Sequence, residues 1–161
     1  MNYEQANSVK ELASPVNKVL EGLKVNVARD VIPCVGSLYA GRSLVGLDKK
    51  THKISYTWTP QVGEWCTYLI GDLGLIHKVQ GEQWVWLSDY GYELHKDSVT
   101  PILEWEEIER VLEKAGFRID ISAVSECIII GDGSKYLANT EANSRQEAVM
   151  KAVIELGKES K

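Results

Sequence analysis

Residues 58–103 constrain the fold most strongly, because turn-forming residues cut them into short runs of strand length. The runs are rich in β-branched and aromatic residues and read EWCTYLI, LIHKV, WVWL, YELHK and SVTPI. Glycine or aspartate separates them at Gly63, Gly71, Asp72, Gly74, Gly81, Asp89 and Gly91. Runs of this length between such residues are typical of strands. The stretch therefore predicts a small antiparallel β-barrel.

The order VGEWCTY, GLIHKV, WVWL and a closing SVTPI resembles the small Src-homology-3-like barrels of the Tudor and KOW kind. The resemblance is confined to residues 58–103. It implies a fold and no particular activity.

Alternation along these strands predicts which tryptophans face outward. Neighbouring strand side chains point to opposite faces. With the aliphatic residues of WVWL inside, Trp84 and Trp86 face out, and Trp65 does the same in EWCTY. Large rings are rarely left in water as a cluster. They either fill a seam against another part of the chain or form a binding surface, to which Tyr90 and Tyr92 are added as candidates.

Residues 1–57 are expected to form an N-terminal helical and β extension. Apolar residues at helical spacing predict two short helices in residues 1–23. Ser14 is the expected N-cap before Pro15, and Gly22 is the expected end of the second helix. This segment either covers an apolar face of the body or binds a partner. Residues 53–58 alternate as a strand, and the polar run DKKTHK at 48–53 is expected at a hairpin tip.

Residues 104–161 predict an α-βββ-α two-layer sandwich. The first helix carries an apolar stripe from Trp105 to Ala115 and stops at Gly116. Strands are expected at 117–121, 126–130 and 135–140, with a tight turn at GDGS 131–134. Ser144 and Glu147 predict a capping box for the last helix, and Gly157 its end. The whole chain is therefore expected to be α+β.

This C-terminal order is also that of double-stranded RNA-binding domains. Those domains use a lysine cluster on the last helix to contact phosphates, and here SRQEAVMKA carries only Arg145 and Lys151. The segments GFRIDI, YLANTEANS and QEAVMKAVIEL more closely resemble small phage and prophage proteins with an αβα-sandwich-like domain. That resemblance implies a phage setting and no established activity.

Glutamates line the other face of the helix at 105–115. Glu104, Glu107 and Glu109 are expected on a solvated acidic surface, which could also imitate nucleic-acid phosphates toward a basic partner. They join the candidate partner-binding residues.

No spacing typical of catalysis or metal binding is present in the sequence. The three histidines are isolated, and Cys34, Cys66 and Cys127 are far apart, so no CxxC or HExxH pattern occurs. We expect no catalytic, cofactor or metal site, and we expect three reduced, mostly buried thiols. No apolar run approaches membrane-spanning length, so no membrane contact and a cytoplasmic location are expected.

These patterns favour a non-enzymatic phage or prophage accessory protein that binds another protein. An inhibitor of a host defence nuclease, of the anti-CRISPR kind, is one alternative. A nucleic-acid-binding module that stacks bases on the barrel aromatics is a second, although the net charge of -5 disfavours phosphate binding. A small enzyme with an unrecognised site is a third.

Overall fold

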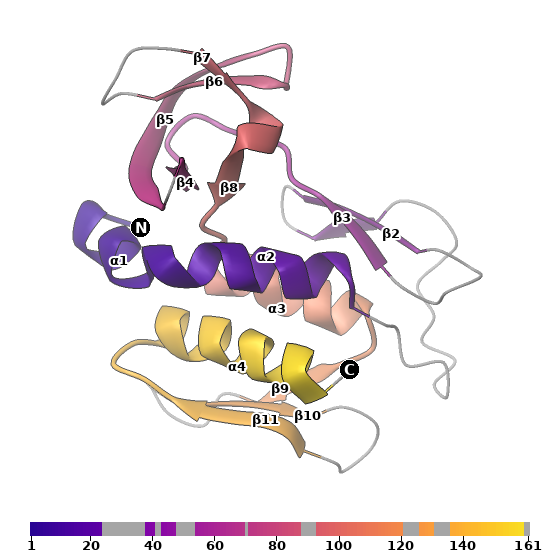
Figure 1. The fold of residues 1–161 in the computed structure, drawn as a ribbon. Helices are drawn as coiled ribbons and strands as arrows, with labels where there is room; N and C mark the ends of the chain where they lie inside the picture. The colour runs from indigo at the N-terminus through magenta and orange to yellow at the C-terminus, as the bar shows by residue number, and fades with distance from the viewer. Residues whose placement is uncertain are drawn as a thin grey trace.

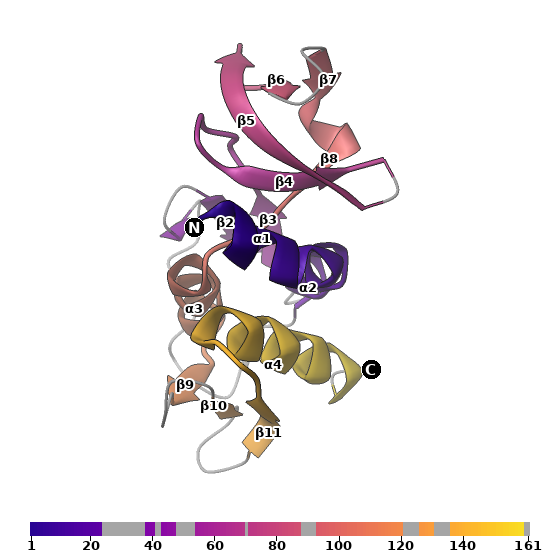
Figure 2. The same cartoon turned by 90° about the vertical axis from the view of Figure 1, so that its left-hand side faces the viewer.

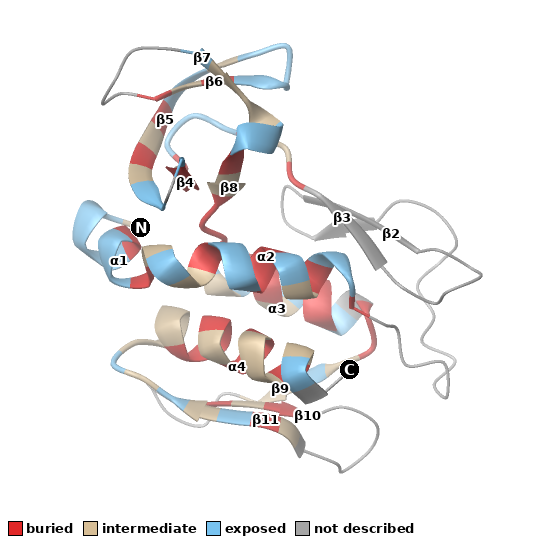
Figure 3. Cartoon of the chain, in the orientation of Figure 1, coloured by how far each residue is buried: buried red, intermediate tan, exposed pale blue. Residues whose placement is uncertain are grey.

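The computed structural model describes residues 1–23, 38–40, 43–47, 54–69, 71–87, 93–120, 126–130 and 136–159. In these ranges the chain is α+β, as predicted, and its sheets are antiparallel. From one end to the other, the layers are a five-stranded sheet, the N-terminal helices, two later helices and a three-stranded sheet (Figure 1). A further three-stranded sheet lies to the right of these layers in this view. Buried residues concentrate between these layers (Figure 3).

The N-terminal segment forms two helices, as predicted. Helix α1 (Tyr3–Val9) passes through a 3-10 turn, η1 (Lys10–Leu12), into α2 (Ala13–Glu21), and Gly22 ends α2. The expected N-cap at Ser14 is wrong, because α2 begins at Ala13 with Leu12 at the cap, two residues earlier than predicted. Pro15 is then in the first turn, where backbone N–H groups have no partner within the helix, so its missing N–H costs nothing.

Helix α2 lies between the two halves of the molecule. Its buried side chains are Ala13, Val16, Asn17 and Leu20. The helix contacts β8 (Val99–Pro101) above and α4 (Arg145–Glu159) below. The Asn17 amide donates to the carbonyl oxygen of Ala13 at 2.8 Å and to that of Pro101 at 3.1 Å. The N-terminal segment is therefore a middle layer of the fold.

All five predicted runs of residues 58–103 form strands. They are β4 (Trp65–Tyr68), β5 (Asp72–Gln80), β6 (Trp84–Leu87), β7 (Glu93–His95) and β8. Their order, β7-β6-β5-β4-β8, is that of an open sheet and not of the closed barrel that the sequence predicts. The edge strands β7 and β8 are not paired with each other; the 3-10 turn η2 (Lys96–Ser98) joins them.

A second sheet contains β1 (Leu38–Ala40), β2 (Ser43–Leu47) and β3 (Ile54–Thr57) in that order. Only β3 was expected from the sequence. Leu47 is opposite Ile54, so the polar run at 48–53 connects a β2–β3 hairpin, and the run itself lies outside the described residues.

The C-terminal part has the predicted order of helix, three strands and helix. Helix α3 (Trp105–Lys114) is followed by β9 (Arg118–Asp120), β10 (Glu126–Ile130) and β11 (Tyr136–Glu141), then by α4. The sheet order is β11-β10-β9, and α3 and α4 pack on it (Figures 1 and 2). The predicted turn at 131–134 lies outside the described residues.

The two predicted helix stops in this part have different outcomes. Gly116 has a φ of 91° and ends α3, with Phe117 N–H donating to the Leu112 carbonyl at 2.9 Å. Gly157 does not end α4, which continues to Glu159. A Cβ on Gly157 would overlap the Val19 side chain of α2. This glycine therefore permits close contact between the two helices.

The α4 capping box is only partly formed. Glu147 N–H donates to the Ser144 hydroxyl oxygen at 3.2 Å, as predicted. The Glu147 carboxylate accepts from the N–H of Asn143 at 3.4 Å. A capping box would use the N–H of Ser144 instead.

Two of the three thiols are buried and free, as expected, while Cys34 lies outside the described residues. Burial raises the pKa of Cys66 to about 12, and the nearby Glu64 carboxylate adds to the shift. Burial likewise raises the pKa of Cys127 to about 11, with a smaller effect of Glu109. Both groups are therefore thiols at neutral pH.

Gly157→Ala should destabilise the chain by about 1–3 kcal/mol through overpacking, although alanine is the better helix former by about 1 kcal/mol. Urea unfolding measures the change. Adding Val19→Ala should recover part of the loss, because it removes the atoms in the way. A stabilising Gly157→Ala substitution would contradict the close α2–α4 contact.

The stability of the chain should also depend on Cys66 at high pH. Its folded pKa of about 12 exceeds the ordinary 9.0, so the thiolate favours the unfolded chain. The stability that the buried neutral thiol contributes is complete below pH 9. It is lost as the pH rises to 12, at about 1.4 kcal/mol per pH unit. The free energy of unfolding of Cys66→Ala should therefore fall less steeply over this range. Equal slopes for both proteins would contradict this burial.

Candidate functional site

The outer surface of β5, β6 and β7 carries two of the predicted outward tryptophans. In β6, Val85 and Leu87 are buried, whereas Trp84 is 43% exposed and Trp86 is half-buried. The predicted alternation in this strand is confirmed. Lys78 is opposite Trp86 on β5, and His95 is opposite Trp84 on β7. We call Lys78, Trp84, Trp86 and His95 the tryptophan face.

Each ring of the tryptophan face has one close neighbour on an adjacent strand. The Trp84 and His95 rings meet edge to face, with centroids 5.0 Å apart and planes at 89°. The Lys78 ammonium lies 5.1 Å from the centroid of Trp86, within range of a cation–π interaction. The indole N–H of Trp86 is buried without a hydrogen-bond partner in the described part of the chain.

Hydrogen bonds hold the His95 ring in place. Its Nδ1 accepts from the Asp97 N–H at 3.2 Å, and its Nε2 lies 3.3 Å from Oε1 of Gln83. With a proton on Nε2 and none on Nδ1, the ring satisfies both contacts. These contacts fix the orientation of the ring that packs against Trp84.

Trp65 is not part of this face. Its indole N–H donates to the Met1 carbonyl at 2.8 Å, and its ring lies 5.9 Å from that of Tyr3 at 65°. Trp65 therefore fills the seam between β4 and α1, which is one of the two interpretations drawn from the sequence. The other four aromatic candidates are divided: Trp84 and Trp86 share a surface, whereas Tyr90 and Tyr92 lie outside the described residues.

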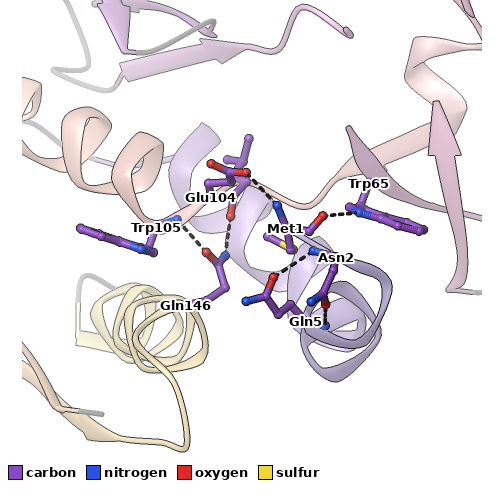
Figure 4. A network of polar contacts seen from close by, with 8 residues as sticks. Met1, Asn2, Gln5, Trp65, Glu104, Trp105 and Gln146 are labelled. Carbon is purple, nitrogen blue, oxygen red and sulfur yellow. Dashed lines mark hydrogen bonds and ion pairs between the residues drawn. The ribbon is translucent and has the colours of Figure 1, made fainter. Parts of the chain in front are cut away.

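A polar network joins this seam to the C-terminal helices (Figure 4). The Met1 amine lies 3.6 Å from the Glu104 carboxylate. The Gln146 side chain accepts from Trp105 N–H at 2.8 Å and donates to the Leu103 carbonyl at 2.6 Å. Here α1, the start of α3 and the start of α4 meet. The sequence held no signal for this meeting.

The acidic residues of α3 do not share one solvated surface. Glu104 is exposed, but Glu107 is only 6% exposed and Glu109 is half-buried. The expectation of a solvated face is wrong for Glu107, because the fold covers this side chain almost completely. Burial raises the pKa of Glu109, and the neighbouring Glu113 raises it further, whereas Arg145 opposes the shift.

A cleft of about 480 Å³ lies beside the polar network and was not predicted. It is lined by residues of α1 and by the first turns of α3 and α4, among them Glu4, Glu104, Trp105, Glu106 and Arg145. The Arg145 guanidinium lies 5.0 Å from the centroid of the Trp105 ring. This neighbour already occupies one side of the ring.

The described residues contain neither a candidate metal site nor a candidate membrane span. No group of three or more histidine, cysteine or acidic residues is placed to hold a metal ion there. No described helix is both long enough and apolar enough to cross a membrane. No protein family, curated protein or solved structure matches the chain.

Replacing Trp65 and Trp84 in turn by phenylalanine should show, through the change in stability, which tryptophan is in the seam and which is on the surface. Trp65→Phe removes the hydrogen bond to Met1 and should cost about 1 kcal/mol of unfolding free energy. Trp84→Phe keeps an exposed ring and should change stability by less than about 0.5 kcal/mol. Urea unfolding measures both. Equal losses would contradict this division.

Proposed function

We propose that this chain is a non-enzymatic accessory protein, of phage or prophage type, that binds another protein through the tryptophan face. One observation carries the proposal: Trp84 is 43% exposed on a strand whose alternate residues are fully buried. A large ring on rigid backbone loses little conformational entropy when it is covered, which is why tryptophan is enriched among residues that dominate binding energy.

The environment of the rings favours a protein partner over a single-stranded nucleic acid. Base stacking needs an open aromatic surface, but Lys78 is positioned over Trp86 and His95 adjoins Trp84. The net charge of -5 also opposes phosphate binding. The nuclease-inhibitor alternative relied on an acidic face, and only Glu104 of its three members is exposed.

The finer fold belongs to the same proposal. We infer that residues 58–103 are a small Src-homology-3-like unit that remains open, followed by an α-βββ-α sandwich. The sheet order β7-β6-β5-β4-β8 and the 3-10 turn before the last strand support the first unit. A register shift between Ile76 and Lys78 lets the long strand β5 serve both halves of the sheet. The phage setting rests on the sequence resemblance, and the cytoplasmic location on the unpaired buried thiols.

Cross-linking from the tryptophan face tests the function. A photoreactive phenylalanine analogue in place of Trp84 should give a defined adduct with a partner protein in the producing cell. The same analogue at Val62, which is 63% exposed away from this face, serves as the matched control. With the purified partner, Trp84→Ala should weaken binding by about 30-fold, corresponding to about 2 kcal/mol. Val62→Ala should leave it unchanged. Equal adducts at both positions would contradict the proposal.

A further inference from the structure

Strand β11 presents an unpaired edge at the other end of the molecule. Among the described strands it pairs only with β10, so one side of its six-residue backbone is open. Figure 2 shows β11 as the outermost strand of its sheet. An open edge offers a row of N–H and C=O groups to another extended chain.

A shallow groove of about 350 Å³ runs beside the end of this edge. It is lined by Thr140 and Glu141 of β11, by Leu12 of η1, and by Lys151, Ile154 and Glu155 of α4. Leu12 and Ile154 are half-buried apolar side chains. The groove can therefore hold an apolar side chain next to free backbone hydrogen-bonding groups. In strand addition, backbone hydrogen bonds provide affinity and side-chain pockets provide specificity.

Strand geometry determines what each position of an added chain would meet. The Thr140 hydroxyl donates to the Ala148 carbonyl of α4 at 2.8 Å, so Thr140 faces the helix. Cross-strand neighbours share a face. A residue opposite Thr140 therefore points toward the groove, and the adjacent residue, opposite Glu141, points to the other side of the sheet.

The exposed Glu141 places a negative charge at the end of strand β11. Glu141 is exposed and has no ion pair within the described ranges, whereas Lys151 is paired with Glu147 at 3.0 Å. Oppositely charged side chains in directly opposed strand positions attract, so a basic residue opposite Glu141 on an added strand is favourable.

We propose that β11 binds an extended segment of a partner protein by strand addition, with an aliphatic side chain in the groove and an adjacent lysine or arginine beside Glu141. This site is separate from the tryptophan face and does not rest on it. A second copy of the chain fits less well, because the β11 sequence YLANTE contains no basic residue to face Glu141.

Selection from a displayed library of random hexapeptides on the immobilised full-length chain tests the site. Enriched peptides should carry an aliphatic residue next to a lysine or arginine. Glu141→Lys should weaken the best of them by about tenfold and shift selection toward acidic residues at that position. Glu21→Lys, which changes an exposed residue of α2 by the same charge, is the control and should bind normally.

Two further variants test the role of the groove and its independence from the tryptophan face. Ile154→Asp should abolish peptide binding, with circular dichroism confirming its fold, and Trp84→Ala should bind normally. Backbone amide signals of 137–141 should shift on titration with the selected peptide. The proposal would be overturned if the enriched peptides bind equally well whatever the charge at position 141, or if no peptide is enriched. Self-association through β11, detected by sedimentation and relieved by Glu141→Lys, would overturn it in favour of a second copy.

Discussion

The fold depends on helix α2 being in contact with both halves of the molecule. The buried Asn17 amide bonds a carbonyl of its own helix and the Pro101 carbonyl 84 residues away. A buried amide without such partners would cost about 1–3 kcal/mol, so the contact selects one placement of the five-stranded sheet on the helix. On the opposite side, Gly157 lets α4 approach the Val19 side chain closely. One short helix therefore contacts both the five-stranded sheet and the helix that packs on the C-terminal sheet.

Local patterns predicted most elements, because period and turn chemistry act over a few residues. All five strands of residues 58–103 form, and so does the α-βββ-α order. What could not be predicted depends on contacts between distant residues. Closure of a barrel, which requires pairing of β7 with β8, is such a case. Gly157 was predicted as a helix end, and the close contact with Val19 of α2 that it permits could not be seen from its local sequence.

The candidate site was predictable in part, on the same physical grounds. Alternation correctly distinguished Trp84 and Trp86 from the buried Val85 and Leu87. It could not say what covers an outward ring. Trp65 faces outward from its strand yet contacts Met1 and Tyr3. Likewise, helical spacing placed Glu107 opposite the apolar stripe but could not reveal that this side of α3 is covered.

The two proposed surfaces differ in the kind of recognition that each backbone permits. On the tryptophan face the strands are already paired, so only side chains are available and specificity depends on ring shape. On β11 the backbone itself is free, and side chains add selectivity through one groove and one charge. The layers of α2 and α4 lie between these ends (Figure 1). Because these layers separate the two proposed surfaces, occupation of one would leave the other accessible.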